Sequence, residues 1–122
     1  MAYDDMNYQE EFQSRLDRET AKALTKYGAG AELPGGHPEK DIHDYTINEI
    51  VGLVRYANMM ISRLEQFRDL KLIPRKIAGG MIDEAYALRS TAFLFGEIMI
   101  LQRRRLRELL GSLGDPEYTS DA

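Results

Sequence analysis

The sequence contains no cysteine and no tryptophan, and only 4 of its 122 residues are proline. The absence of cysteine excludes disulfide bonds, thiolate nucleophiles and zinc sites built on sulfur. No apolar run approaches the roughly 18 residues that a membrane-spanning helix requires. Residues 1–5 are acidic and lack the apolar segment of a signal peptide. We therefore expect a cytoplasmic protein that has no membrane partner.

An excess of basic charge is also missing, because 20 acidic residues outnumber 16 basic ones and give a net charge of −4. This balance argues against nucleic acid as a partner, since proteins that bind it neutralise phosphates with a surplus of lysine and arginine. The length fits one domain, and the 43% share of hydrophobic residues is ordinary for a globular protein.

Apolar residues recur at helical spacing in three segments, of which the first is residues 1–27. This segment predicts an N-terminal amphipathic helix from about Asp5 to Tyr27. Asp4 or Asp5 is expected to cap it, and Gly28 is expected to end it. Its apolar positions are Tyr8, Phe12, Leu16, Ala23, Leu24 and Tyr27.

Residues 28–40 are predicted to form a Gly/Pro-rich loop, because their 4 glycines and 2 prolines forbid both a helix and a central strand. The loop lacks the glycine spacings of P-loops and of dinucleotide-binding folds. Two roles remain open for it. It is either a lid that closes over a ligand, with Lys40 as a donor, or a simple linker.

Residues 41–114 predict a helical hairpin. Its first helix is expected to begin at the capping-box pattern Thr46–Glu49 and to end at Ile73–Pro74. Two apolar rows run along it: Ile50, Leu53, Ala57, Met60, Leu64 and Phe67, and beside them Ile47, Val51, Val54 and Ile61. A glycine inside this helix, Gly52, predicts the close approach of another helix, as does Gly96 in the next one.

Pro74 to Gly80 is expected to form a turn region, closed by Gly79 and Gly80, in which a short helix is an open alternative. The second helix of the hairpin is then expected to begin at Met81 and to end at Gly111 and Gly114. Residues 115–122 follow as an acidic tail. The apolar row of this helix is interrupted only by Gln102 and comprises Met81, Ala85, Leu88, Ala92, Phe95, Met99, Leu106, Leu109 and Leu113.

These segments predict an all-α fold: an N-terminal helix and a long antiparallel helical hairpin, assembled as a helical-bundle homo-oligomer. The two long helices carry more apolar surface than one chain can bury, so we expect a dimer or a tetramer. The alternative is a self-contained monomeric bundle.

Arginines near the end of the last helix are the main candidate for a binding site. Arg103, Arg104 and Arg107 suit an anionic ligand, because guanidinium groups bind phosphate bidentately. The alternative is that they complement the helix macrodipole. Other polar and aromatic residues are expected either to flank the apolar rows or to line a pocket between chains. These residues are Arg55, Arg89, Tyr45 and Tyr56.

A metal site is a weaker hypothesis. The sequence groups His37, Asp41, His43 and Asp44, but their spacing matches no known ligand motif, and helix capping by Asp41 or Asp44 is the expected role. Acidic residues do not form the paired clusters of helical pyrophosphohydrolases. We therefore expect no cofactor, no metal and no catalytic residue.

The sequence thus favours a non-enzymatic, homo-oligomeric binding protein that sequesters a small anionic ligand, such as a nucleotide or cyclic nucleotide. The alternative is a helical adaptor or inhibitor that binds a protein partner through its N-terminal helix and hairpin surface, as small viral accessory proteins do. A metal-dependent nucleotide hydrolase is the third hypothesis.

Overall fold

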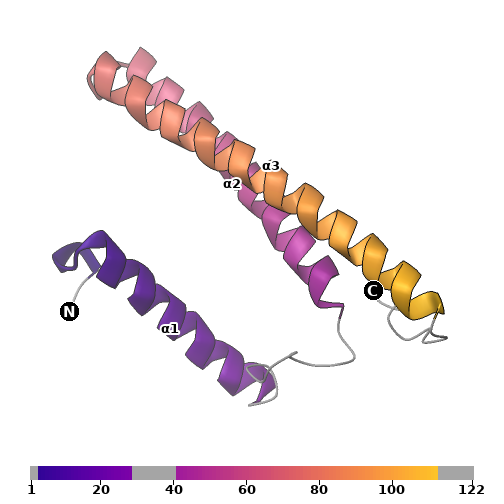
Figure 1. Ribbon diagram of the computed structural model, residues 1–122. Helices are drawn as coiled ribbons and strands as arrows, with labels where there is room; N and C mark the ends of the chain where they lie inside the picture. Colours follow the sequence, from indigo (N-terminus) through magenta and orange to yellow (C-terminus); the bar gives the residue numbers. More distant parts are fainter. Residues whose placement is uncertain (1–2, 29–40, 113–122) are drawn as a thin grey trace. The chain divides into compact units, whose positions relative to one another are not determined.

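The computed structural model describes residues 3–28 and 41–112, and all the regular structure in this part of the chain is helical (Figure 1). A short 3-10 turn, Tyr3–Asp5, precedes α1 (Tyr8–Tyr27), which is followed by α2 (Ile42–Asp69) and α3 (Arg75–Ser112). The predicted loop after Gly28, with His37 and Lys40, lies outside the described residues, as do the predicted helix end at Leu113 and Gly114 and the predicted acidic tail 115–122. The chain divides into two units, of which one contains α1 and the other contains α2 and α3.

The capping residue of α1 is Asn7 rather than Asp4 or Asp5. Its Oδ1 accepts a hydrogen bond from the backbone N–H of Glu10 at 2.8 Å, and its Nδ2 donates to Glu10 Oε1 at 2.8 Å. The two aspartates instead lie in or at the end of the preceding 3-10 turn. Gly28 ends the helix as predicted: its φ is +80°, and its N–H donates to the carbonyl of Leu24.

The N-terminal cap of α2 is Asp41, so the predicted start at Thr46 was wrong. The Asp41 carboxylate accepts from the N–H of Asp44 at 3.0 Å, which satisfies one of the free donors of the first turn. Thr46 lies within the helix, and its hydroxyl donates to the carbonyl of Ile42. The capping role expected for Asp41 is confirmed.

The tip of the hairpin, between α2 and α3, closes through backbone hydrogen bonds. The N–H of Leu72 donates to the carbonyl of Phe67, and that of Lys71 donates to Arg68. This pattern is a Schellman motif, in which one residue takes a left-handed conformation. That residue is Lys71, with φ +61°, although glycine is usual at this position. Helix α2 therefore ends at Asp69, before the predicted Ile73.

The third helix begins at Arg75, because the carbonyl of Pro74 accepts the first helical hydrogen bond from Ala78. The prediction that Gly79 and Gly80 close a turn was wrong. Both glycines lie within α3, where an added Cβ would meet nothing within 4 Å. They are tolerated there because a glycine inside a helix costs only about 1 kcal/mol relative to alanine. Within the described residues α3 is 38 residues long, about 57 Å, against about 42 Å for the 28 residues of α2.

Helices α2 and α3 pack against each other as an antiparallel hairpin (Figure 1). Pairs that bridge them confirm the direction: Asn58 contacts Arg89, and Asp41 contacts Arg103. A Cβ on Gly96 would lie 3.5 Å from Cγ2 of Ile50, so the two helices pass closely there as predicted. At Gly52 nothing of the described chain lies within 4 Å of an added Cβ, so the hairpin itself supplies no close approach at that position.

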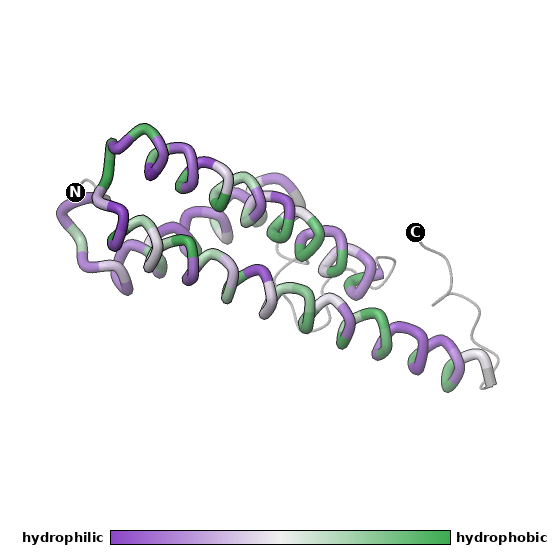
Figure 2. Tube along the Cα trace, turned by 90° about the horizontal axis from the view of Figure 1, so that it is seen from above, coloured by the Kyte–Doolittle hydropathy of each residue, from purple (hydrophilic) through white to green (hydrophobic). Residues whose placement is uncertain are grey.

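The seam between α2 and α3 is built mainly of small side chains. Its buried residues are Ala57, Ile61, Ala78, Ile82, Ala85 and Ala92. Leu64 packs against this cluster. Larger apolar residues remain exposed along both helices. Figure 2 shows how hydrophobic and hydrophilic residues alternate along these two long helices. No described helix is long and apolar enough to cross a membrane.

Candidate functional site

The open end of the hairpin, opposite the tip, carries an ion pair between the start of α2 and the end of α3. Arg103 Nε donates to Asp41 Oδ2 at 2.7 Å, and Arg103 Nη2 lies 3.9 Å from Asp44 Oδ1. The side chains of Arg103 and Asp41 are only 18% and 12% exposed. Arg103, predicted to bind an anionic ligand, is thus already neutralised by two carboxylates of its own chain.

The pKa of the Asp41 carboxyl lies below its ordinary value of 3.8. Burial of this carboxyl acts to raise the pKa, but hydrogen bonds from the N–H of Asp44 and from Arg103 stabilise the charged form more. The positive charges of Arg103 and Arg107 add to that effect. The carboxylate therefore stays ionised and holds both the helix cap and the arginine.

A second polar contact joins the same two helices near the open end. His43 Nε2 and Gln102 Oε1 lie 3.1 Å apart. Because an amide oxygen only accepts, His43 must donate from Nε2 in this contact. Gln102, the one polar interruption of the apolar row, therefore has a partner across the seam.

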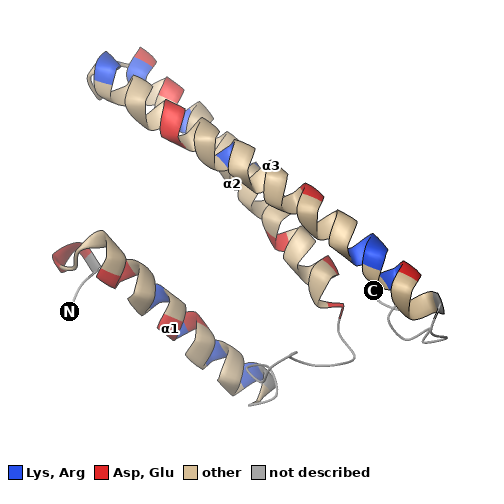
Figure 3. Cartoon of the chain, viewed as in Figure 1, with Lys and Arg blue, Asp and Glu red and all other residues tan. Residues whose placement is uncertain are grey.

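The other arginines of this end are not held in the same way. Arg104 and Arg105 are exposed and form no ion pair within residues 3–28 and 41–112. Arg107 is half-buried, and its Nε is a buried donor without an acceptor in the described part of the chain. Figure 3 shows this basic group on α3 close to the acidic start of α2. Donor capacity for an anion thus remains at Arg104 and Arg107.

The remaining candidate residues lie elsewhere on the hairpin. Arg89 Nη1 donates to Asn58 Oδ1 at 2.8 Å, and its Cζ lies 4.6 Å from the centre of the Tyr86 ring. Arg89 is 14 residues from Arg103, which corresponds to about 21 Å along α3. Tyr45, Arg55 and Tyr56 are exposed on α2. Within the described residues, one chain therefore does not gather the predicted ligand-binding residues into a single pocket.

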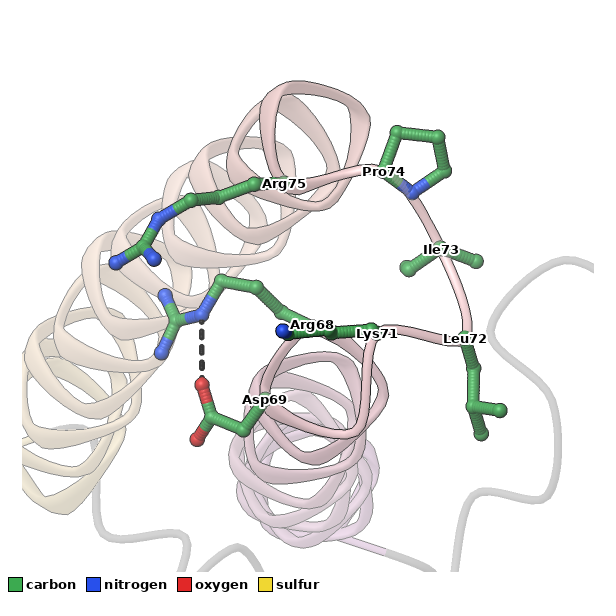
Figure 4. A pocket seen from close by; sticks show the side chains of 7 residues that line it. All are labelled: Arg68, Asp69, Lys71, Leu72, Ile73, Pro74 and Arg75. Atoms are coloured by element: carbon green, nitrogen blue, oxygen red, sulfur yellow. Dashed lines mark hydrogen bonds and ion pairs between the residues drawn. The ribbon is translucent and has the colours of Figure 1, made fainter.

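The tip of the hairpin forms a hollow that the sequence did not indicate. Its volume is about 550 Å³, and it is lined by Arg68, Asp69, Lys71, Leu72, Ile73, Pro74 and Arg75. Figure 4 shows the guanidinium groups of Arg68 and Arg75 extending to the same side, with Arg68 paired to Asp69 at 3.1 Å. A smaller hollow of about 390 Å³ lies on α2 around Ser62. No group of three or more metal-ligating side chains occurs in the described part of the chain.

The most extensive feature of the hairpin is its exposed apolar surface. The apolar rows predicted from the sequence do not lie wholly in the seam. In each row, some residues lie in the seam and others are exposed. From the last helix, Ala85, Ala92 and Met99 enter the seam, whereas Met81, Leu88 and Phe95 remain 42%, 39% and 54% exposed. From α2, Ala57 is buried and Leu53 and Met60 are 39% and 41% exposed.

Comparison with known proteins adds nothing to this geometry, because no family model, no curated protein and no solved structure matches the chain.

Proposed function

We propose that this chain is a non-catalytic binding protein that works as a homo-oligomer of helical hairpins. The observation that carries the proposal is the surface of α3 from Phe93 to Leu101. Three consecutive residues, Phe93, Leu94 and Phe95, are 54%, 56% and 54% exposed. Consecutive helical residues point about 100° apart, so one neighbouring helix cannot cover all three. A helix that is apolar on all sides is normally buried in protein.

We propose that further copies of the same chain bury this exposed apolar surface of α3. Ile98, Ile100 and Leu101 continue the same apolar surface, with exposed fractions of 37%, 37% and 57%. Contiguous apolar patches of this kind on a soluble protein mark an interaction surface. Helix α2 covers only one side of α3, so contacts on more than one other side are expected in the assembly.

Sedimentation equilibrium across a wide range of protein concentration tests this proposal. The expected result is a mass of at least twice 14.0 kDa that falls on dilution. A mass of one chain at every concentration would refute self-association. It would favour the adaptor hypothesis, in which a protein partner binds the hairpin or the exposed Tyr8, Phe12 and Leu16 of α1.

We propose, as a second step, that the assembly sequesters a small anionic ligand of the nucleotide or cyclic-nucleotide type. The support is the unpaired donor capacity of Arg104 and of Arg107 Nε near the end of α3. An oligomer brings several copies of these groups together, and planar guanidinium groups suit phosphate.

A thermal-shift screen with mono-, di- and cyclic nucleotides tests the ligand. Binding to the folded form raises the unfolding midpoint. The variant Arg104→Gln is expected to abolish the shift, whereas Lys76→Gln, which removes the same charge at the tip, is expected to retain it. Arg103→Gln is unsuitable, because it breaks the ion pair with Asp41. The absence of a shift with any nucleotide would refute the ligand and leave self-association standing.

A further inference from the structure

Eight residues form two rows on the same side of the hairpin, and we name this surface the layered face. Each row has a spacing of seven residues. The α2 row is Thr46, Leu53, Met60 and Phe67, and the α3 row is Met81, Leu88, Phe95 and Gln102.

The two rows lie on one side because each member follows a seam residue by three positions. Leu53 follows Ile50, which contacts α3 at Gly96, and Met60 follows the buried Ala57. Leu88 and Phe95 follow the buried Ala85 and Ala92 in the same way. Three helical residues correspond to a rotation of about 300°, or 60° backwards. In two right-handed helices that run antiparallel, this common offset turns both rows to the same side of the seam.

The rows are also level with each other. The contact of Asn58 with Arg89 fixes the register of the hairpin, and a step of seven residues forward on α2 corresponds to seven residues back on α3. The layered face therefore consists of four pairs: Thr46 with Gln102, Leu53 with Phe95, Met60 with Leu88, and Phe67 with Met81. Three of these layers are apolar, and the one at the open end is polar.

We propose that the layered face of one chain packs on the layered face of a second copy, with open end against open end, to form a four-helix core. This inference rests on the self-association proposed above and assigns it a surface and an orientation. Apolar residues repeated every seven positions are what helices of a four-helix bundle bury against one another. A twofold axis parallel to the hairpin places α2 of each copy against α3 of the other.

The charges beside the layered face fit a second copy in this orientation. Arg63 and Glu84 each follow a member of the rows by three positions, at the same level of the hairpin. Neither forms an ion pair within the described residues. The proposed axis brings Arg63 of each copy opposite Glu84 of the other, so the edges of the face are complementary in charge.

The polar layer determines the orientation. With open ends together, Gln102 and Thr46 meet their counterparts in the second copy, and Gln102 keeps its hydrogen bond with His43. With an open end against a tip, Gln102 would face Phe67 and Met81, and its Nε2 amide group would lose water without gaining an acceptor. A buried polar residue that lacks a partner is unfavourable, and such residues fix register in helical assemblies.

Two phenylalanines provide a matched test of the surface. Phe95 belongs to the layered face and Phe93 lies on the opposite side of the seam, yet both are 54% exposed. Phe95→Gln is expected to raise the dimer dissociation constant at least about 30-fold, the size of a hot-spot truncation. Phe93→Gln is expected to change it less than about threefold, although it weakens any larger assembly. Circular dichroism checks that both variants remain helical.

The outcomes separate this inference from the proposal on which it rests. If the wild type is monomeric, both are refuted. If the wild type associates and Phe93→Gln dissociates the dimer while Phe95→Gln does not, self-association stands and the layered face is refuted. Equal effects of the two variants would also refute the face.

Spin labels test the orientation, and the absence of cysteine makes each introduced cysteine the sole labelling site. Labels on Lys76→Cys, at the tip, are expected less than about 30 Å apart in the dimer, since packed helices lie about 10 Å apart. Labels on Asn48→Cys, near the open end, are expected to be similarly close. If open ends pack against tips, the two labels at the tip lie about 40 Å apart, the length of the 28-residue α2, which would refute the orientation.

Discussion

The seam of the hairpin and its layered face are equally regular, but they are built of side chains of different size. In the seam, Ala57, Ala78 and Ala92 are 0%, 0% and 1% exposed. On the layered face, Leu53, Met60, Leu88 and Phe95 are 39–54% exposed. Apart from Ile61 and Ile82, many of the larger apolar side chains therefore lie outside the intramolecular core, where their burial would yield more free energy per residue than burial of an alanine does in the seam.

This difference indicates how the chain divides its stability between folding and association. Small seam residues let α2 and α3 approach closely, but they bury little apolar area per residue. Burial of a Leu, Met or Phe side chain contributes about 1.5–3 kcal/mol, and on the layered face that contribution is realised only when another surface covers it. The seam determines the shape of the hairpin, and burial of the layered face provides the free energy for the proposed assembly.

The largest effect on stability is expected from a charge introduced into the seam. Ala92→Glu places a carboxylate at a position that is 1% exposed. We expect the free energy of unfolding to fall by at least about 3 kcal/mol, because a buried charge lacks a partner there. Urea denaturation followed by circular dichroism measures the loss. For Ser90→Glu, at a nearby exposed position, the free energy of unfolding should stay within about 0.5 kcal/mol of the wild-type value. Equal losses for the two variants would contradict the burial of Ala92 between α2 and α3.

The next largest loss of stability is expected at the open end of the hairpin, where Asp41 caps α2 and pairs with Arg103. Asp41→Ala removes both the cap of α2 and the ion pair with Arg103, and should cost about 2 kcal/mol of stability. Asp41→Asn keeps a capping acceptor and should cost less. The exposed pair of Glu19 with Lys22 supplies the control, since Glu19→Ala should change stability by less than about 0.5 kcal/mol. If Asp41→Ala lowered the free energy of unfolding no more than the control does, the contacts of Asp41 at the open end would contribute nothing to stability.

The contribution of Asp41 to stability is also expected to depend on pH. Asp41 has a lowered pKa in the folded chain, so the folded form binds fewer protons than the unfolded form in acid. Its contribution to stability is fully present above the unfolded pKa of 3.8 and is lost as the pH falls through the folded pKa. Denaturation midpoints measured between neutral pH and pH 3 should therefore converge for the wild type and Asp41→Asn. A constant difference between the two proteins at all pH values would contradict this role.

The smallest effect is expected on the outer surface of α3. Gly80→Ala adds a Cβ in open space within a helix and should stabilise the hairpin by about 1 kcal/mol. Gly28→Ala, by contrast, places a side chain at φ +80° and should destabilise α1. Thermal unfolding measures both changes. A loss of stability in Gly80→Ala would show that another surface packs closely at that position.

Helical periodicity was sufficient to predict the all-α fold and the two long helices, because three-and-four spacing persists over Ile50–Phe67 and from Met81 onward. The helix boundaries were less well predicted. Thr46 matched a capping box, but the carboxylate of Asp41 caps the helix five residues earlier, and it also pairs with Arg103, a residue 62 positions away. Sequence spacing contains no information on such a distant partner.

The division of the apolar rows also escaped sequence reasoning. Ala85 and Leu88 belong to one periodic row, and their spacing alone does not tell which of them faces α2. The choice depends on close packing, which favours the smaller side chain in the seam. Among the candidate site residues, the basic composition of the α3 end was evident, but the engagement of Arg103 by Asp41 and Asp44 was not.

The short tip has a consequence for the order in which the hairpin forms. Contacts beside the tip join residues close in sequence, whereas the Asp41–Arg103 pair closes a segment of 62 residues. The entropic cost of closing a segment grows with its length, and local contacts form fastest. Folding is thus expected to proceed from the tip toward the open end, and unfolding is expected to begin at the open end. Backbone amides near Asp41 and Arg103 should accordingly exchange with deuterium before those near Ile61 and Ile82.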